Sequence, residues 1–202
     1  MTPIKLGITG GIGSGKSVVA RVLQTMDIPV FDCDVESKRL CVVHPDIRQQ
    51  LIALVGEDVY LSSGSECFNS QLNKPLLAQY LFASALHVQQ VNSIIHPVVK
   101  DCFKKWIEEQ KAFIVAVESA ILFEAGFDDV VDSVVMVLAP LEVRIERAMQ
   151  RDGVSRSAIE ERIRQQMSDE EKRIRSQFIV LNDGKCSVIP QVLDIIRTLS
   201  QK

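Results

Sequence analysis

Several features that mark membrane, secreted or nucleic-acid-binding proteins are missing from this sequence. No apolar run approaches the roughly 18 residues that a membrane-spanning helix needs. The formal net charge of −3 gives the chain no global electrostatic reason to bind nucleic acid or an anionic membrane. The three histidines do not cluster with the cysteines in sequence, so we expect no zinc site.

The cysteines also argue against an extracellular protein. They are odd in number and form no C-x-x-C pair: Cys33, Cys41, Cys67, Cys102 and Cys186. The chain runs from Met1 directly into a predicted strand and leaves no room for a signal peptide. We therefore expect reduced thiols and a cytoplasmic protein. The 202 residues, 47% of them hydrophobic, suffice for one globular domain with a sizeable core and an inserted subdomain.

A glycine-rich stretch from Gly10 to Ser17 reads G-G-I-G-S-G-K-S and fits the phosphate-binding pattern G-x-x-x-x-G-K-[ST]. An apolar stretch over 4–9 predicts the strand before it, and Val18, Val19, Val22, Leu23 and Met26 predict a helix after it. Glycines let the backbone N–H groups point inward, and the helix N-terminus adds a positive dipole end. A plain strand-to-helix turn would explain neither Lys16 nor Ser17. A Rossmann loop is excluded because its third glycine position is Lys16.

Two carboxylates follow the second predicted strand, Ile28–Phe31. Asp32 and Asp34 lie at its carboxyl end, where ligands gather in open α/β sheets. Asp34 has a second interpretation, as the N-cap of a helix from Val35 to about Val42. A capping aspartate can also hold a substrate hydroxyl, so the two interpretations are compatible.

The chain from about 35 to 111 reads mostly as helix, interrupted by a loop from Gly56 to Gly64, with one helix ending at His96-Pro97 and another following it. A crossover between parallel strands needs only about a dozen residues. We therefore predict an inserted helical subdomain that holds the second substrate.

Three more strands are predicted over 112–117, 133–138 and 177–181, and a closing helix follows the turn at Asn182-Asp183-Gly184. Glu118 ends the first of them, where it either orients waters on Mg²⁺ or faces solvent. The segment 141–175 is nearly neutral and is predicted to be a mobile lid. In its helix from Leu141, we expect Leu141, Ile145 and Ala148 to face the core. The other face has two interpretations: Arg144 and Arg147 are solvated, or they close on a polyphosphate.

These elements predict an α/β fold: a three-layer P-loop kinase fold with a five-stranded, mostly parallel sheet, an inserted helical substrate subdomain and a helical lid. The predicted core covers about 1–34, 112–140 and 176–202, the substrate subdomain about 35–111 and the lid about 141–175, all in one domain. Neither the N-K-x-D nor the D-x-x-G motif of regulatory GTPases occurs. A small-molecule kinase is best supported, with a slowly hydrolysing nucleotide switch and a kinase for a nucleoside or nucleotide as alternatives.

The chain resembles the dephospho-coenzyme A kinase family. The motifs that carry the resemblance run from residue 9 to 184: Thr9 to Ser17, Asp32-Cys33-Asp34, His96-Pro97, Leu122-Phe123-Glu124, Gln150-Arg151-Asp152 and Asn182-Asp183-Gly184. The resemblance implies transfer of the ATP γ-phosphate to the ribose 3′-hydroxyl of dephospho-coenzyme A, the last step of coenzyme A synthesis. A Leu-Asp-Arg stretch common in the family appears here as Leu72-Asn73-Lys74, which leaves the substrate role of Lys74 open.

Phosphoryl-transfer chemistry and the resemblance together assign the expected roles. Lys16 and Asp34 are the catalytic candidates, with Asp34 taking or orienting the 3′-hydroxyl proton. Ser17 is the Mg²⁺ ligand. Asp32, Asp34 and His96 are expected to bind the acceptor, although His96 also fits a structural role. The expected ATP contacts come from the loop, the lid and the last strand's exit: Gly11, Gly13, Ser14, Gly15, Lys16, Ser17, Val18, Arg151, Asn182 and Gly184. Arg147 and Arg156 are further lid candidates. No nucleic-acid or membrane partner is expected.

Overall fold

The computed structural model describes residues 2–61 and 71–201 and forms two compact units. The first unit combines Met1–Asp32 with Trp106–Lys202, and the second is Cys33–Lys105. Cys67 and the end of the predicted loop from Gly56 to Gly64 lie outside the described residues. Within the described part of the chain, no helix has both the length and the apolar character to cross a membrane.

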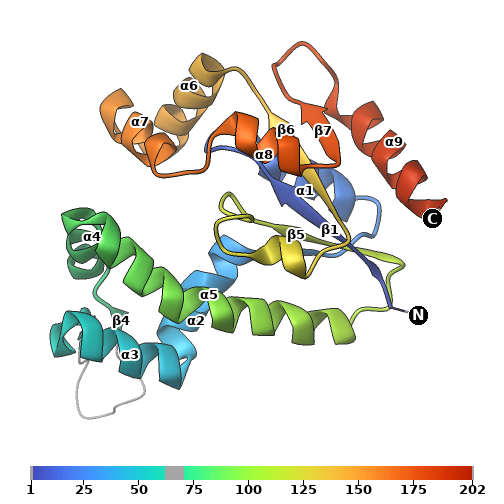
Figure 1. Ribbon diagram of the computed structural model, residues 1–202. Helices are drawn as coiled ribbons and strands as arrows, with labels where there is room; N and C mark the ends of the chain where they lie inside the picture. Colours follow the sequence, from blue (N-terminus) through green and yellow to red (C-terminus); the bar gives the residue numbers. More distant parts are fainter. Residues whose placement is uncertain (1, 62–70, 202) are drawn as a thin grey trace. The chain divides into compact units, whose positions relative to one another are not determined.

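A five-stranded parallel sheet forms the centre of the first unit (Figure 1). Its strands are β1 (Ile4–Thr9), β2 (Val30–Asp32), β5 (Ile114–Glu118), β6 (Ser133–Leu138) and β7 (Phe178–Leu181). Their order is β2-β5-β1-β6-β7, so β1 is central and the loop that leaves it emerges between two neighbours. The predicted fold class is therefore confirmed.

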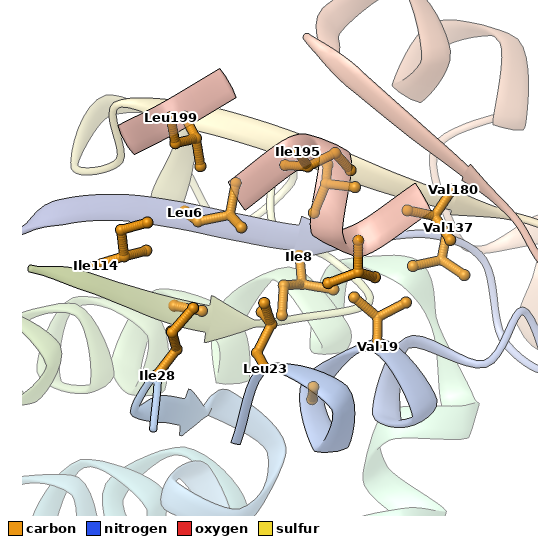
Figure 2. Packing of buried hydrophobic residues seen from close by; sticks show 14 residues of the cluster. Leu6, Ile8, Val19, Leu23, Ile28, Ile114, Val137, Val180, Ile195 and Leu199 are labelled. Atoms are coloured by element: carbon orange, nitrogen blue, oxygen red, sulfur yellow. The ribbon is translucent and has the colours of Figure 1, made fainter. Parts of the chain in front are cut away.

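Helices α1 (Lys16–Gln24) and α9 (Val188–Ser200) pack against each other and against one face of this sheet. Figure 2 shows their core, in which Leu6 and Ile8 of β1 meet Leu23 of α1 and Ile195 of α9. Each such side chain, taken fully out of water, stabilises the fold by roughly 2 kcal/mol. This packing fixes the strand before the phosphate loop and the helix after it.

The remaining helical elements of the first unit are α6 (Leu141–Asp152), α7 (Arg156–Arg164), α8 (Asp169–Arg175) and the short 3₁₀ helix η2 (Phe127–Asp129). A separate small core of Ile145, Ala148 and Ile159 joins α6 to α7. Ser168 caps α8 through a capping box with Glu171, as the S-x-x-E pattern indicates.

The second unit is mainly helical. Its elements are α2 (Cys33–Val43), α3 (Pro45–Val55), the 3₁₀ helix η1 (Glu57–Val59), β3 (Tyr60–Leu61), β4 (Gln71–Leu72), α4 (Lys74–Ala83) and most of α5 (Ala85–Glu108). The antiparallel pair β3–β4 was not predicted, because two-residue strands are too short to show an alternating pattern. Asn73 caps α4 by accepting a hydrogen bond from the Leu76 amide, and Lys74 is exposed beside it.

Helix α5 corrects one prediction. The expected break at His96-Pro97 is wrong: α5 is one helix of 24 residues that contains Pro97. Its buried residues Val91, Ile95, Val99 and Phe103 recur every four positions straight through the proline. Burial of this continuous stripe outweighs the loss of one backbone hydrogen bond at Pro97.

Candidate active site

The loop between β1 and α1 has the conformation that its glycines allow. Gly10, Gly13 and Gly15 have positive φ angles of 142°, 76° and 93°, a region that other residues rarely enter. Gly15 then starts the helix, since its carbonyl accepts from the amides of Val18 and Val19. The loop thus turns sharply and leads directly into the N-terminus of α1. Phosphate binding by backbone N–H groups requires this arrangement.

Lys16 and Ser17 occupy the first turn of α1. The Lys16 ammonium lies back over the loop, 3.1 Å from the carbonyl oxygen of Gly10 and 3.4 Å from that of Gly11. Its positive charge is therefore held above the turn that would receive phosphate oxygens. Ser17 is exposed, and so is Val18 at 38%, which leaves the Ser17 hydroxyl open to an approaching ligand.

Asn182, at the carboxyl end of β7, supports the loop from its side. Its Nδ2 donates to the carbonyl of Ser14 over 2.8 Å, and its own amide donates to Leu138 over 2.8 Å. A side chain at Gly15 would collide with the Asn182 amide group. The structure therefore brings together three of the predicted ATP residues, Ser14, Gly15 and Asn182, as a bonded set.

Ile12, at the tip of the loop, is anchored to the segment that was predicted to be a mobile lid. Its amide donates to Gln166 Oε1 over 3.1 Å, and its carbonyl accepts from Arg144 Nε over 3.0 Å. Its side chain packs against the small core of α6 and α7 that contains Ile145. Both backbone polar groups of Ile12 are thus bonded to side chains from 141–175.

Arg144 overturns the predicted orientation of α6. It is buried, with 2% of its surface exposed, and it forms an ion pair with Asp169. Leu141, which was predicted to face the core, is 51% exposed. The buried face of α6 is Arg144, Ile145 and Ala148, so a solvated Arg144 is wrong. The reason is a tertiary contact: the loop places the Ile12 carbonyl opposite Arg144, and this carbonyl needs a hydrogen-bond donor.

The loop glycines next to Arg144 are needed for close packing. A Cβ atom at Gly11 would overlap the Arg144 guanidinium, and one at Gly13 would overlap the Arg144 backbone carbonyl. Gly11 and Gly13 were predicted as ATP contacts, which stays a prediction. The structure gives an independent reason for glycine at these two positions, which is the close approach of α6.

Carboxylates line the sheet edge where the loop emerges. Asp32 of β2 is in register with Glu118 of β5, and Glu118 is in register with Ile8 of β1. Asp32 is exposed at the strand end and Glu118 is partly buried. Asp34 does not cap a helix: α2 begins at Cys33, so Asp34 lies exposed in its first turn. The helix starts as soon as β2 ends, which moves the cap position upstream of Asp34.

The basic residues of the lid segment differ in their surroundings. Arg147 is half-buried and donates to the Asn182 carbonyl over 3.0 Å, close to Gly184. Arg151 is exposed in the last turn of α6 and pairs with Asp152, whose pKa is held below its ordinary value by Arg151 first and Arg162 second. The exposed Arg156 binds Glu142 and Glu160 over 2.8 and 2.7 Å.

The two acceptor candidates of the second unit lie on different helices. Asp34 is in the first turn of α2, and His96 is half-buried in the middle of α5, directly before Pro97. Asp34 is thus exposed to solvent, whereas His96 is partly buried within a continuous helix.

Comparison with known proteins resolves which kinase family combines this loop with these carboxylates. The model of the dephospho-CoA kinase family matches residues 4–187, which includes both units. The chain belongs to the dephospho-CoA kinase family. A dephospho-CoA kinase of Bacteroides fragilis is 53% identical over 200 residues, covering 98% of this chain and 94% of its own. That of Porphyromonas gingivalis is 42% identical over 200 residues, covering 98% of this chain and 96% of its own.

A solved structure has the same architecture. The crystal structure of a Thermus thermophilus protein is 32% identical, covers 98% of both chains and superposes with a TM-score of 0.83. The architecture of this dephospho-CoA kinase family member is therefore shared with an experimentally determined relative over nearly its full length.

Sequence reasoning missed a buried polar cluster of this kinase that lies behind the loop. Lys172 of α8 is fully buried, donates to the Ala120 carbonyl over 2.6 Å and pairs with Glu124 at 3.2 Å. Burial lowers the pKa of Lys172, and the Glu124 charge opposes that shift. Glu124 also accepts from the Met167 amide.

Proposed function

We propose that this chain transfers the γ-phosphoryl group of ATP to the 3′-hydroxyl of the ribose of dephospho-coenzyme A. The observation that carries the proposal is the strand edge where a complete phosphate loop stands beside Asp32 and Glu118, in a chain of this family. The loop supplies the donor side of a kinase site. The carboxylates at and after β2 supply an acceptor side, which a simple nucleotide-binding module does not need.

The donor side works through charge and position. In phosphoryl transfer the transition state is loose and its charge lies on the phosphoryl oxygens, so stabilising that charge dominates catalysis. The amides from Gly13 to Ser17 and the dipole of α1 bind the phosphates. The Lys16 ammonium, held over the turn by the Gly10 carbonyl, moves only a short way to reach the β- and γ-oxygens.

On the acceptor side, the proton of the 3′-hydroxyl has to be removed during transfer. The 3′-oxygen attacks the γ-phosphorus as the bond from phosphorus to the bridging β,γ-oxygen breaks, and ADP leaves. The hydroxyl proton passes to the Asp34 carboxylate, which returns it to solvent. General base catalysis of this kind contributes about 10²- to 10⁴-fold. Asp32, two residues earlier at the end of β2, positions either the substrate or a water molecule on the metal ion.

The residues present fit Mg²⁺, which the family's ATP-dependent chemistry implies. The exposed Ser17 hydroxyl would hold the ion, and Asp32 and Glu118 are oxygen donors at the same strand edge. Among the described residues no group of three or more histidines, cysteines or acids forms a metal cluster. That suits Mg²⁺, because the ion is commonly held by one or two protein oxygens together with phosphates and water. When bound, it would neutralise developing phosphate charge.

We also propose a division of labour along the chain. The helical segment of about 35–111 receives the acceptor, and 141–175 covers ATP through Arg147 and Arg151. Asn182 and Gly184 line the adenine side. His96 contributes to acceptor binding from α5. We expect the enzyme to act in the cytoplasm, where its thiols remain reduced.

A transfer assay tests the function. The purified chain, ATP and Mg²⁺ are incubated in turn with dephospho-coenzyme A, with nucleosides and nucleotides, and with no acceptor, and labelled product and ADP are measured. We expect phosphate to appear on dephospho-coenzyme A far faster than on the others. Faster transfer to a nucleoside would assign another kinase activity, and ADP release without an acceptor dependence would assign a nucleotide switch.

A further inference from the structure

The phosphate loop is held from its outer side by a series of polar contacts that ends on α8. Arg144 of α6 uses two parts of its guanidinium at once. Its Nε donates to the Ile12 carbonyl over 3.0 Å, and its Nη1 binds the Asp169 carboxylate. Asp169 is the first residue of α8, and these hydrogen bonds connect it to Arg144 and not directly to the loop. The carboxylate therefore reaches the loop through the arginine.

The arginine is well suited to transmit this contact. It is 2% exposed, and a buried charge is costly unless it is paired and hydrogen-bonded. The planar guanidinium fixes the angle between its donors, so a carboxylate at Nη1 determines where Nε points. Asp169 thus orients Arg144 toward Ile12.

Helix α8 is itself held in place by a second charged residue. Lys172 lies three residues after Asp169, on the same face of the helix, and is fully buried. Its ammonium binds the Ala120 carbonyl and Glu124, in the segment that follows β5. Helix α8 is therefore held through two charged side chains: the buried Lys172 secures it to the segment after β5, and the partly exposed Asp169 connects it through Arg144 to the loop after β1.

We propose that Asp169, acting through Arg144, is a positioning residue that sets the ATP affinity of the phosphate loop. Ile12 stands between Gly11 and Gly13, and its carbonyl shares a peptide group with the Gly13 amide, which we expect to bind phosphate. Arg144 fixes that peptide group through the Ile12 carbonyl, and Gln166 fixes the preceding one through the Ile12 amide. The proposal rests on the proposed function only in naming dephospho-coenzyme A as the acceptor. Its own test measures ATP binding, which needs no acceptor.

The test compares four variants by titrating the purified chain with ATP and Mg²⁺, using calorimetry at a temperature where all are folded. They are Asp169→Asn, Arg144→Lys, their double variant and Glu170→Gln. Glu170 is the matched control, because it is also an acid in the first turn of α8 but is exposed and pairs with Arg173 instead of Arg144. Its loss removes the same favourable interaction with the helix dipole.

We expect Asp169→Asn to raise the Kd for ATP about fivefold, in the range of coupling between directly contacting residues, while Glu170→Gln leaves it unchanged. Lysine cannot bind the Ile12 carbonyl and Asp169 together, so Arg144→Lys should raise the Kd at least as much. The double variant should bind ATP no more weakly than Arg144→Lys alone. The KM for dephospho-coenzyme A and kcat at saturating ATP should stay within about twofold of the wild type.

Two results would overturn the proposal. One is an Asp169→Asn variant that binds ATP as tightly as Glu170→Gln. The other is an Asp169→Asn effect that persists in full when Arg144 is already lysine, since Asp169 would then act by another route. An unfolded Arg144→Lys variant leaves the first comparison intact. Absence of transfer to dephospho-coenzyme A by the wild type would refute the proposed function, and the ATP titrations would still decide this inference.

Discussion

The side-chain amide of Asn182 donates to the carbonyl oxygen of Ser14 over 2.8 Å, which ties the end of β7 to the middle of the phosphate loop. These two residues are 168 positions apart in the chain. The contact joins the central strand of the sheet to an edge strand, and it fixes the Ser14 carbonyl of the loop relative to the end of β7.

Removing this contact should weaken ATP binding. Asn182→Ala leaves the Ser14 carbonyl without its donor and lets the loop relax, so we expect the Kd for ATP to rise about tenfold, the loss of about one hydrogen bond. Titration with ATP and Mg²⁺ measures it. Gln191→Ala is the control, because Gln191 bonds both backbone groups of Leu181 at the same strand end and not the loop. If both variants lost the same ATP affinity, the end of β7 would affect ATP binding only through the stability of the fold.

Lys16 should be needed for transfer and dispensable for folding. Its ammonium contacts loop carbonyls and is not part of the packed core, so Lys16→Ala should melt as the wild type does. Its loss should lower kcat/KM by about 10³-fold, the upper range for removal of one charge-stabilising donor. Lys111→Ala, at an exposed lysine beyond α5, controls for charge. Substantial turnover by Lys16→Ala would make the loop a structural feature.

Asp34→Asn tests the acceptor side. An amide cannot take the hydroxyl proton, so we expect kcat to fall by about 10²-fold or more while the Kd for ATP stays near that of the wild type. Steady-state kinetics with dephospho-coenzyme A and ATP titrations give both numbers. Asp46→Asn is the matched control, since Asp46 is likewise an acid in the first turn of a helix, α3. Normal turnover by Asp34→Asn would assign the proton to another group.

Lys172 makes the stability of the fold depend on pH in a defined direction. Burial lowers its pKa below the ordinary 10.5, so near that pH the unfolded chain binds more protons than the folded one. Its contribution to the free energy of unfolding therefore increases as pH rises through the window that ends at about 10.5.

Denaturant unfolding between neutral pH and about pH 10 measures this effect. The wild type should gain stability relative to Lys172→Met as pH rises. Arg173→Met, at an exposed neighbour, should show no such trend. A constant difference between wild type and Lys172→Met would mean that the buried ammonium keeps its ordinary pKa.

Sequence patterns predicted the sheet well because its strands are continuous apolar runs with sharp ends. Both β1 and β6 have the predicted bounds, since Gly10 and Pro140 bound the apolar stretches. The order of the strands is set by long-range pairing, which no local pattern contains. In α5, local reasoning failed for the opposite reason: it gave weight to Pro97, whereas tertiary burial of the stripe kept the helix intact.

Within the candidate site, the residues of the phosphate motif could be predicted from the sequence, and the buried contacts that hold the loop in place could not. Gly15, Lys16 and Ser17 follow from a motif whose spacing reflects phosphate geometry. Arg144 was misplaced because helical periodicity assigns an arginine to solvent. Only the position of the Ile12 carbonyl, known from the folded loop, shows why a buried guanidinium is stable there. The roles of Asp32, Asp34 and His96 remain predictions that the acceptor kinetics test.

The packing of α6 against Gly11 and Gly13 changes how mutations in this loop are to be interpreted. An alanine at either position meets Arg144 before it meets a phosphate. An alanine scan of the loop would therefore score these two glycines as essential even if their amides bound no nucleotide. A background with a smaller residue at 144 would relieve the overlap at Gly11, whereas at Gly13 the overlap is with the backbone of residue 144 and would remain. Genetic intolerance at this motif thus reports the architecture of the kinase as well as its chemistry.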